Sequence, residues 1–96
     1  MIDLYTWSTP NGRKISILLE ELNLKYKVFP INIMKNEQFN ENFLKISPNN
    51  KIPAILDSQN NISIMESGAI MLYLAEKYKK FLPTKFDHRF KCIEWL

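Results

Sequence analysis

The chain has 96 residues, the usual size of one globular domain, so two full domains are excluded. Hydrophobic residues make up 46% of the sequence and charged residues 24%, a composition that supports a packed core. The formal net charge of +3 comes from scattered basic residues rather than a basic stripe, so we expect no nucleic-acid partner.

The sequence has one cysteine, Cys92, and one histidine, His88. A single cysteine excludes an internal disulfide, and this pair leaves almost no ligands for zinc, so we expect no metal site. One unpaired cysteine fits a reducing compartment, and the N-terminus has neither a basic leader nor a long apolar run. We therefore expect a cytoplasmic protein without a membrane partner.

The first third of the chain has the pattern of a strand, a helix and a second strand. Residues 2–7 alternate with a period of two, which is typical of a strand. Thr9 can cap a helix that has Pro10 at its first position, and apolar residues at helical spacing extend that helix toward the next strand. Residues 26–33 predict a second strand parallel to the first, with Pro30 toward an edge.

The rest of the chain predicts a short helix, a hairpin and a longer helix. Residues 36–46 have an apolar face that includes Phe39, and they predict the short helix. Residues 51–57 and 62–65 are apolar runs on either side of a polar turn, as in an antiparallel hairpin. The longer helix begins at residues 66–68 and carries its apolar face to Tyr78.

The predicted order of elements is βαβ, then a helix, then ββα, which is an α/β fold of thioredoxin-like type. Its mixed four-stranded sheet would have helices on both faces. We assign residues 1–83 to this domain, and residues 84–96, which include a helix from residue 87, to the start of a truncated all-helical C-terminal domain. A redox dithiol would lie where the first strand meets the first helix, but no cysteine is present there. Sulfur chemistry at this junction must use a thiol that a ligand brings.

Four parts of the sequence carry a family signal: Tyr5, Ser8–Lys14, Ser47–Ile55 and Glu66–Glu76. With these motifs, residues 1–83 resemble the N-terminal glutathione-binding domain of the glutathione transferases, in particular the bacterial Nu-class glutathione-dependent disulfide-bond reductases. The resemblance implies glutathione as co-substrate, a disulfide or electrophilic small molecule as second substrate, and a homodimer. Fungal nitrogen regulators of transferase fold look similar, so a non-catalytic glutathione-binding or interaction module stays open.

The Nu-class pattern places the contacts to the glutathione sulfur at Thr9 and Asn11, where the first helix begins. Hydrogen bonds from these side chains, together with the positive end of the helix dipole, would favour the thiolate over the thiol. Tyr5 and Ser8 stay open as alternative hydroxyl donors.

The Ile52-Pro53 step is a candidate for a cis peptide bond, because cis is cheap only before proline. It would turn the N–H and C=O of Ile52 outward, so that the cysteinyl part of glutathione could pair with them as an added strand. The alternative is that Pro53 merely begins a strand.

Glu66 and Ser67 suit the charged γ-glutamyl end of glutathione, the former for its ammonium and the latter for its carboxylate. The alternatives are that Ser67 simply caps its helix and that Gly68 serves close packing. Gln38 matches a glutathione-contacting position of the Nu-class pattern, and the alternative is a solvated glutamine. Lys51 could meet the glycyl carboxylate, although a lysine is usually just a surface residue.

Overall fold

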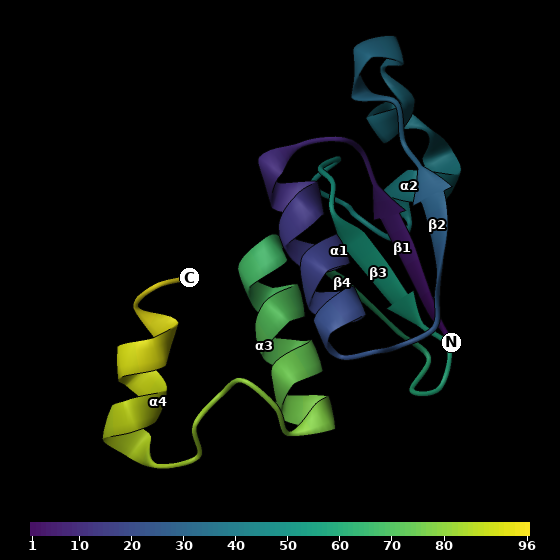
Figure 1. Ribbon diagram of the computed structural model, residues 1–96. Helices are drawn as coiled ribbons and strands as arrows, with labels where there is room; N and C mark the ends of the chain where they lie inside the picture. The colour runs from purple at the N-terminus through teal and green to yellow at the C-terminus, as the bar shows by residue number, and fades with distance from the viewer.

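A mixed four-stranded sheet with strand order β2-β1-β3-β4 forms the centre of the fold (Figure 1). The structure is a computed structural model that describes residues 1–96. The strands are β1 (Ile2–Thr6), β2 (Tyr26–Pro30), β3 (Ala54–Asp57) and β4 (Ile62–Met65). β1 pairs parallel with β2 and antiparallel with β3, and β3 pairs antiparallel with β4. The predicted βαβ unit and hairpin are confirmed.

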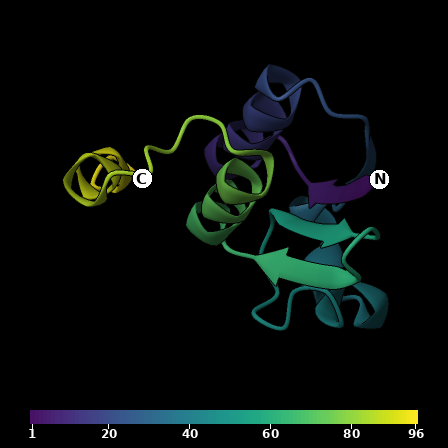
Figure 2. The same cartoon turned by 90° about the horizontal axis from the view of Figure 1, so that it is seen from below.

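Helices cover both faces of this sheet, as predicted. α1 (Pro10–Glu21) and α3 (Ser67–Tyr78) lie side by side on one face, and α2 (Glu41–Leu44) lies against the other (Figure 2). Apolar side chains from the central strands and from the α1 and α3 segments form one buried cluster: Ile2, Leu4, Ile15, Leu19, Leu22, Ile55, Ile70 and Leu74. Burial of these residues fixes both helices on the sheet, and so fixes the position of each helix N-terminus relative to the strands.

The prediction of one helix over residues 36–46 is wrong for most of its length. The chain instead forms two 3₁₀ turns before α2, η1 (Ile33–Lys35) and η2 (Glu37–Phe39). Asn36 is in the left-handed region with φ 60°, and Asn40 is extended and caps α2 through its side chain. Asparagine side chains that bond the nearby backbone compete with a continuous helix. Phe39, predicted to face inward, is 55% exposed.

Two predicted strands are shorter than their apolar patterns indicate. β2 ends at Pro30 rather than residue 33, and β3 begins at Ala54 rather than residue 51. Proline has no N–H to donate to a strand ladder, and Pro53 immediately precedes β3.

The final helix, α4 (Phe86–Ile93), stands apart from the sheet next to α3 (Figure 1). It begins one residue before the predicted start and ends three residues before the end of the chain. Arg89 of α4 donates to the Glu76 carboxylate of α3 at 3.0 Å. No helix of the chain is long and apolar enough to cross a membrane.

Candidate functional site

One cavity of about 300 Å³ brings together five of the predicted site residues. Thr9, Asn11, Gln38, Lys51 and Ile52 line it, together with Ile33 and Asn50. They come from the start of α1, from the turns after β2 and from the loop before β3. The parallel pairing of β1 with β2 and the antiparallel pairing of β1 with β3 bring these three connections to one end of the sheet.

The start of α1 presents several free donors to this cavity. Thr9 is the N-cap, and its hydroxyl oxygen accepts the Gly12 N–H at 3.1 Å. A hydroxyl that accepts in this way keeps its own proton to donate. The Asn11 N–H has no backbone acceptor within the chain, and its side chain is exposed. A hydroxyl, an amide and a backbone N–H therefore meet at the positive end of the α1 dipole, an arrangement that stabilises an anion.

Gly12 allows α1 to begin this close to β1. A Cβ at this buried position would collide with the Thr6 hydroxyl oxygen and with the Trp7 carbonyl oxygen. Only glycine fits there, so Gly12 sets the approach of the Thr9 cap to the end of the strand. Gly12 is not among the predicted site residues, although a glycine in the first turn of a predicted helix was the available signal.

The Ile52-Pro53 peptide bond is cis, as predicted. The N–H and C=O of Ile52 form no hydrogen bond within the chain. The preceding loop is held by the buried Ser47, whose hydroxyl donates to the Lys51 carbonyl at 2.8 Å. Ile52 thus offers an unpaired donor and acceptor on a fixed backbone at the edge of the cavity.

Gln38 and Lys51 complete the lining with an unpaired acceptor and an unpaired cation. The Oε1 atom of Gln38 is buried and has no hydrogen-bond partner in the chain. A buried acceptor without a partner costs free energy that a ligand N–H can recover. Lys51 is exposed and takes part in no ion pair.

Ser67 lies outside this cavity, and so does Glu66. Ser67 lines a separate cavity of about 170 Å³. Glu66 is the exposed N-cap of α3, with φ 74° and no side-chain bond to the helix. Its carboxylate is therefore free, in a backbone conformation that is rare for a residue with a side chain and that clusters at functional sites.

The two alternative roles for the start of α3, Ser67 as the helix cap and Gly68 as a site of close packing, are both wrong. The Ser67 hydroxyl makes no hydrogen bond within the chain, and the N-cap is Glu66, so Ser67 does not cap α3. A Cβ at Gly68 would meet nothing within 4 Å, so Gly68 does not serve close packing. The start of α3 leaves open space beside unpaired polar groups.

Tyr5 and Ser8, the alternative hydroxyl donors, line other recesses. The Tyr5 ring stacks on Phe29 with 4.8 Å between the centroids, in a cavity of about 410 Å³ beside α2. Burial, and then the charge of Asp3, raise the pKa of the Tyr5 phenol above its ordinary value. Ser8 lines a further recess with Arg13. Neither residue shares the cavity of Thr9 and Asn11, so the geometry favours the latter pair.

Comparison with known families shows which family the chain belongs to. Residues 1–76 match the family model described as glutathione S-transferase, N-terminal domain. The chain belongs to this family. Over 101 residues it is 48% identical to the disulfide-bond oxidoreductase YfcG of Escherichia coli, a match that covers 100% of this chain and 47% of that protein. It is also 49% identical over 74 residues to the protein URE2 of Candida albicans, covering 76% of this chain and 22% of that protein.

Solved structures of the glutathione transferase family share the fold. A family member from Pseudomonas fluorescens with two glutathione molecules bound matches at a TM-score of 0.91 and 43% identity. The match covers 98% of this chain and 43% of that one. The chain thus spans about half the length of these relatives or less.

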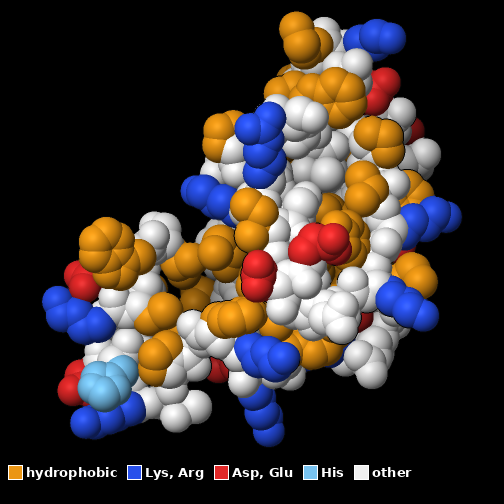
Figure 3. All heavy atoms as spheres, in the orientation of Figure 1, with side chains coloured by type: hydrophobic (Ala, Val, Ile, Leu, Met, Phe, Trp, Pro, Cys, Tyr) orange, Lys and Arg blue, Asp and Glu red, His pale blue; other side chains and the backbone are white.

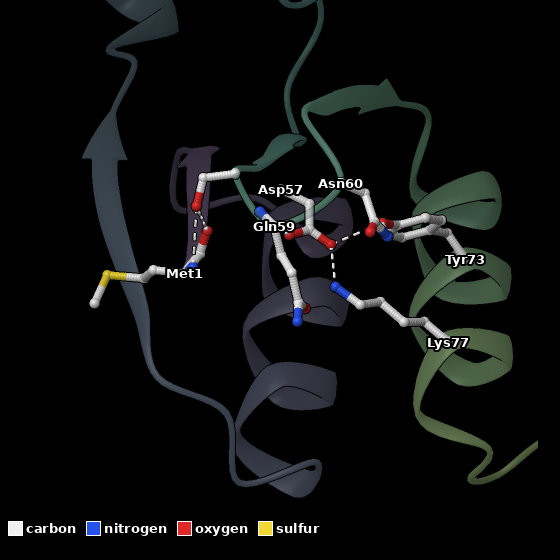
Figure 4. A network of polar contacts seen from close by, with 7 residues as sticks. Met1, Asp57, Gln59, Asn60, Tyr73 and Lys77 are labelled. Atoms are coloured by element: carbon white, nitrogen blue, oxygen red, sulfur yellow. Dashed lines mark hydrogen bonds and ion pairs between the residues drawn. The ribbon is translucent and has the colours of Figure 1, made fainter.

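A buried carboxylate that sequence reasoning missed lies at the other end of this transferase domain. Asp57 is 1% exposed and accepts hydrogen bonds from the Tyr73 hydroxyl at 2.7 Å and the Lys77 ammonium at 2.5 Å, both on α3 (Figure 4). It also accepts the Gln59 N–H at 3.1 Å, and Asn60 donates to the Tyr73 oxygen at 2.9 Å. The available signal was an acidic residue that continues the inward alternation of β3.

Burial by itself would raise the pKa of the Asp57 carboxyl. The hydrogen bonds from Lys77, Tyr73 and the Gln59 N–H, with the charge of Lys77, outweigh burial and hold this pKa below its ordinary value. Asp57 therefore stays ionised at neutral pH and ties α3 to the end of β3. The chain has no cluster of histidine, cysteine, aspartate or glutamate side chains that could hold a metal ion.

Proposed function

We propose that this chain is a glutathione-binding domain that activates the glutathione sulfur as a thiolate for disulfide reduction or, as the second reaction, for conjugation to an electrophile. One observation carries the proposal. Thr9 and Asn11, at the start of α1, share a cavity with the unpaired backbone groups of Ile52 and the unpaired amide oxygen of Gln38. The relative named disulfide-bond oxidoreductase and the glutathione-bound neighbour support this choice of ligand.

In the proposed complex, each part of glutathione meets a group of matching chemistry. Thr9 and Asn11 donate hydrogen bonds to the sulfur, and the Asn11 N–H adds a third donor. The cysteinyl backbone pairs with the N–H and C=O of Ile52 beside Pro53, as an added strand does. Gln38 accepts a ligand N–H.

The two ends of the tripeptide reach opposite sides of the cavity. The glycyl carboxylate meets the Lys51 ammonium. The γ-glutamyl group extends toward the start of α3, where the Ser67 hydroxyl and the unpaired helix N–H groups meet its carboxylate and Glu66 meets its ammonium.

The proposed chemistry follows from the donors around the sulfur. They stabilise the anion more than the neutral thiol, so the pKa of the bound thiol falls and more of it is reactive at neutral pH. The thiolate attacks one sulfur of a disulfide and releases the other half as a thiolate, and a second glutathione resolves the mixed disulfide. No cysteine of the chain takes part; Cys92 lies on α4 and donates to the Phe81 carbonyl at 3.6 Å.

Titration calorimetry with glutathione tests the binding, and two assays then separate the reactions. One assay supplies the disulfide form of a small dithiol, and the other supplies a chlorinated aromatic compound. Activity with the disulfide alone supports the reductase, activity with the aromatic alone supports the transferase, and binding without either supports the non-catalytic module. Absence of glutathione binding overturns the proposal. Thr9→Val, which keeps the side-chain shape and removes the hydroxyl, should lower the turnover, whereas Ser8→Ala should not.

We propose further that the chain acts in the cytoplasm and forms homodimers. Phe86, Phe90 and Trp95 are largely exposed, and covering such side chains with a second copy would stabilise the assembly. We also propose residues 84–96 as a unit distinct from the glutathione-binding domain of residues 1–83. The separate position of α4 and the family match over residues 1–76 support this division.

A further inference from the structure

The cavity of about 410 Å³ beside α2 has no part in the proposed function. It lies on the face of the sheet that α2 covers, between the ends of β1 and β2 and the segment of η2 and α2. Its volume is within the usual range of small-ligand sites, about 300–1,000 Å³, and exceeds the roughly 150 Å³ that holds benzene. The lining combines aromatic and aliphatic side chains with a few polar ones, which is typical of a site for an amphipathic small molecule.

Two stacked rings, those of Tyr5 and Phe29, form the aromatic part of this lining together with Phe43. The parallel pairing of β1 with β2 places Tyr5 opposite Phe29. The Tyr5 ring centroid lies 6.1 Å from that of Phe43, which is 2% exposed and so anchors the ring pair to the core. A cation already lies on this surface, because the Lys27 ammonium is 5.1 Å from the centroid of the Phe29 ring. Aromatic faces attract cations, so the ring pair suits a positively charged ligand with an apolar body.

Glu37 is the only charged residue of the lining, and its carboxylate has no cationic partner. The Oε1 atom accepts the Asn32 N–H at 2.7 Å, which orients the carboxylate. Glu37 takes part in none of the ion pairs of the chain, and its Oε2 atom accepts no hydrogen bond. The side-chain amide of Asn42 also lines the cavity, so its oxygen is a second, neutral acceptor. These acceptors suit an ammonium group, which has three N–H donors and no acceptor.

The charges next to the cavity do not reverse this preference. Asp3 and Lys27 lie opposite each other in the paired strands β1 and β2, so their opposite charges largely offset each other. Neither residue lines the cavity. The carboxylate of Glu37 therefore sets the sign of the charge that a bound ligand meets.

The η2 turn separates this cavity from the one proposed for glutathione. Glu37 lines the former and its neighbour Gln38 lines the latter, and no residue lines both. Met34 and Phe39 are exposed, and at this end of the molecule hydrophobic side chains lie at the surface beside acidic and basic ones (Figure 3). The segment thus borders solvent, and the two cavities can be occupied at the same time.

We propose that the cavity beside α2 is a second binding site, and that it takes a small organic cation that carries an aromatic ring, as the arylalkylamines do. The ring of the ligand packs against the Tyr5–Phe29 pair, and its ammonium group donates to the Glu37 carboxylate. A neutral ligand leaves this carboxylate without a partner and an anionic ligand is repelled by it, so the site selects by charge. Because the two cavities share no residue, this binding does not depend on the proposed function.

Nuclear magnetic resonance titration of the isotope-labelled 96-residue chain tests this proposal with three ligands of similar shape. They are phenethylammonium, phenethyl alcohol and hydrocinnamate. We expect the ammonium compound to bind about threefold to tenfold more tightly than the alcohol, and the carboxylate to bind more weakly than the alcohol. The preference for the ammonium compound should shrink at high salt. The shifted backbone amides should centre on Tyr5, Phe29 and Glu37, and saturating glutathione should leave the affinity for the ammonium compound unchanged.

Two variants separate the charge from the aromatic surface. Glu37→Gln keeps an oxygen that can accept the Asn32 N–H and removes the charge, so it should lower the affinity for phenethylammonium to that for the alcohol. Phe29→Leu should weaken all three ligands and keep their order. Glu41→Gln is the matched control, because Glu41 is an exposed glutamate of α2 outside the lining, and this variant should keep the charge preference. Circular dichroism checks that each variant keeps the wild-type fold.

Three results would overturn the inference. The first is equal binding of the ammonium compound and the alcohol, and the second is a charge preference that persists in Glu37→Gln. The third is a set of shifts centred on Thr9, Asn11 and Ile52 with competition by glutathione, which would place the amine in the glutathione cavity. A chain that binds phenethylammonium beside α2 but does not bind glutathione would contradict the proposed function and leave this inference intact.

Discussion

Replacing Asp57 by asparagine should destabilise the chain strongly at neutral pH. The substitution keeps the side-chain shape, but Tyr73 and the Gln59 N–H donate to different oxygens of the carboxylate, so the single amide oxygen of asparagine can accept from only one of them. It removes the negative charge that faces the Lys77 ammonium. The side chain of Lys77 is only 17% exposed, so water replaces the lost partner incompletely.

The expected loss follows from the burial of the pair. Removing one partner of a fully buried ion pair costs about 3–5 kcal/mol, and a hydrogen bond to a charged group contributes about 1.5–3 kcal/mol. Because Lys77 keeps some contact with water, we expect Asp57→Asn to lower the free energy of unfolding by about 2–4 kcal/mol. This is a large share of the stability of a chain of this size.

The same substitution should have a distinctive pH dependence. The pKa of Asp57 is lower in the folded chain than in the unfolded chain, where it has its ordinary value of about 3.9. The native carboxylate therefore stabilises the fold above that value, and this contribution is lost as pH falls through the folded pKa. The difference in the free energy of unfolding between the wild-type chain and Asp57→Asn should have its full value near neutral pH and should shrink below about pH 4.

Urea unfolding, monitored by circular dichroism at several pH values, measures the difference in unfolding free energy between the wild-type chain and Asp57→Asn. Glu76→Gln is the matched control, because it breaks the more exposed ion pair with Arg89 and should cost less than about 1 kcal/mol. A loss for Asp57→Asn as small as that of the control would show that the Asp57–Lys77 pair does not stabilise the fold as proposed, and so would a loss that stays constant down to pH 3.

Three further predictions concern the site and the last helix. Gly12→Ala should destabilise the fold by at least about 1–3 kcal/mol in urea unfolding, because its Cβ would collide with the Thr6 hydroxyl and the Trp7 carbonyl. Gly68→Ala, where the Cβ meets open space, should be neutral or stabilising by up to about 1 kcal/mol in the same experiment. Phe90→Ser should lower the self-association of the chain in sedimentation experiments, because Phe90 is exposed on α4. If both the wild-type chain and the variant sediment as monomers, the proposed homodimer is contradicted.

The junction of β1 and α1 was predictable because its signals are local. Thr9 followed by Pro10 marks a helix start whatever the rest of the chain does, and the helix indeed begins at Pro10 with Thr9 as its cap. The alternation of β1 also places Tyr5 on the face opposite Leu4, which explains why its ring meets Phe29 rather than the Thr9 cavity.

Of the features that sequence reasoning missed, one is local and two depend on tertiary packing. The apolar pattern around Phe39 imitates a helix, but asparagine side chains stabilise separate turns there. The separation of Ser67 from the Thr9 cavity depends on how α3 sits on the sheet, which no local pattern contains. The Asp57 network likewise forms only when Lys77 is brought beside β3.

Thiolate activation at the start of α1 is tested most directly by the pKa of the glutathione thiol when glutathione is bound to the chain. Ultraviolet absorbance of the thiolate, titrated with pH, measures it in the wild-type chain, in Thr9→Val/Asn11→Ala and in the control Tyr5→Phe. We expect a bound thiol pKa below the free value of about 8.5, a higher pKa in the double variant and an unchanged one in Tyr5→Phe. A bound thiol that titrates as it does in free solution, or one that shifts in Tyr5→Phe and not in the double variant, would contradict the assignment of thiolate activation to the start of α1.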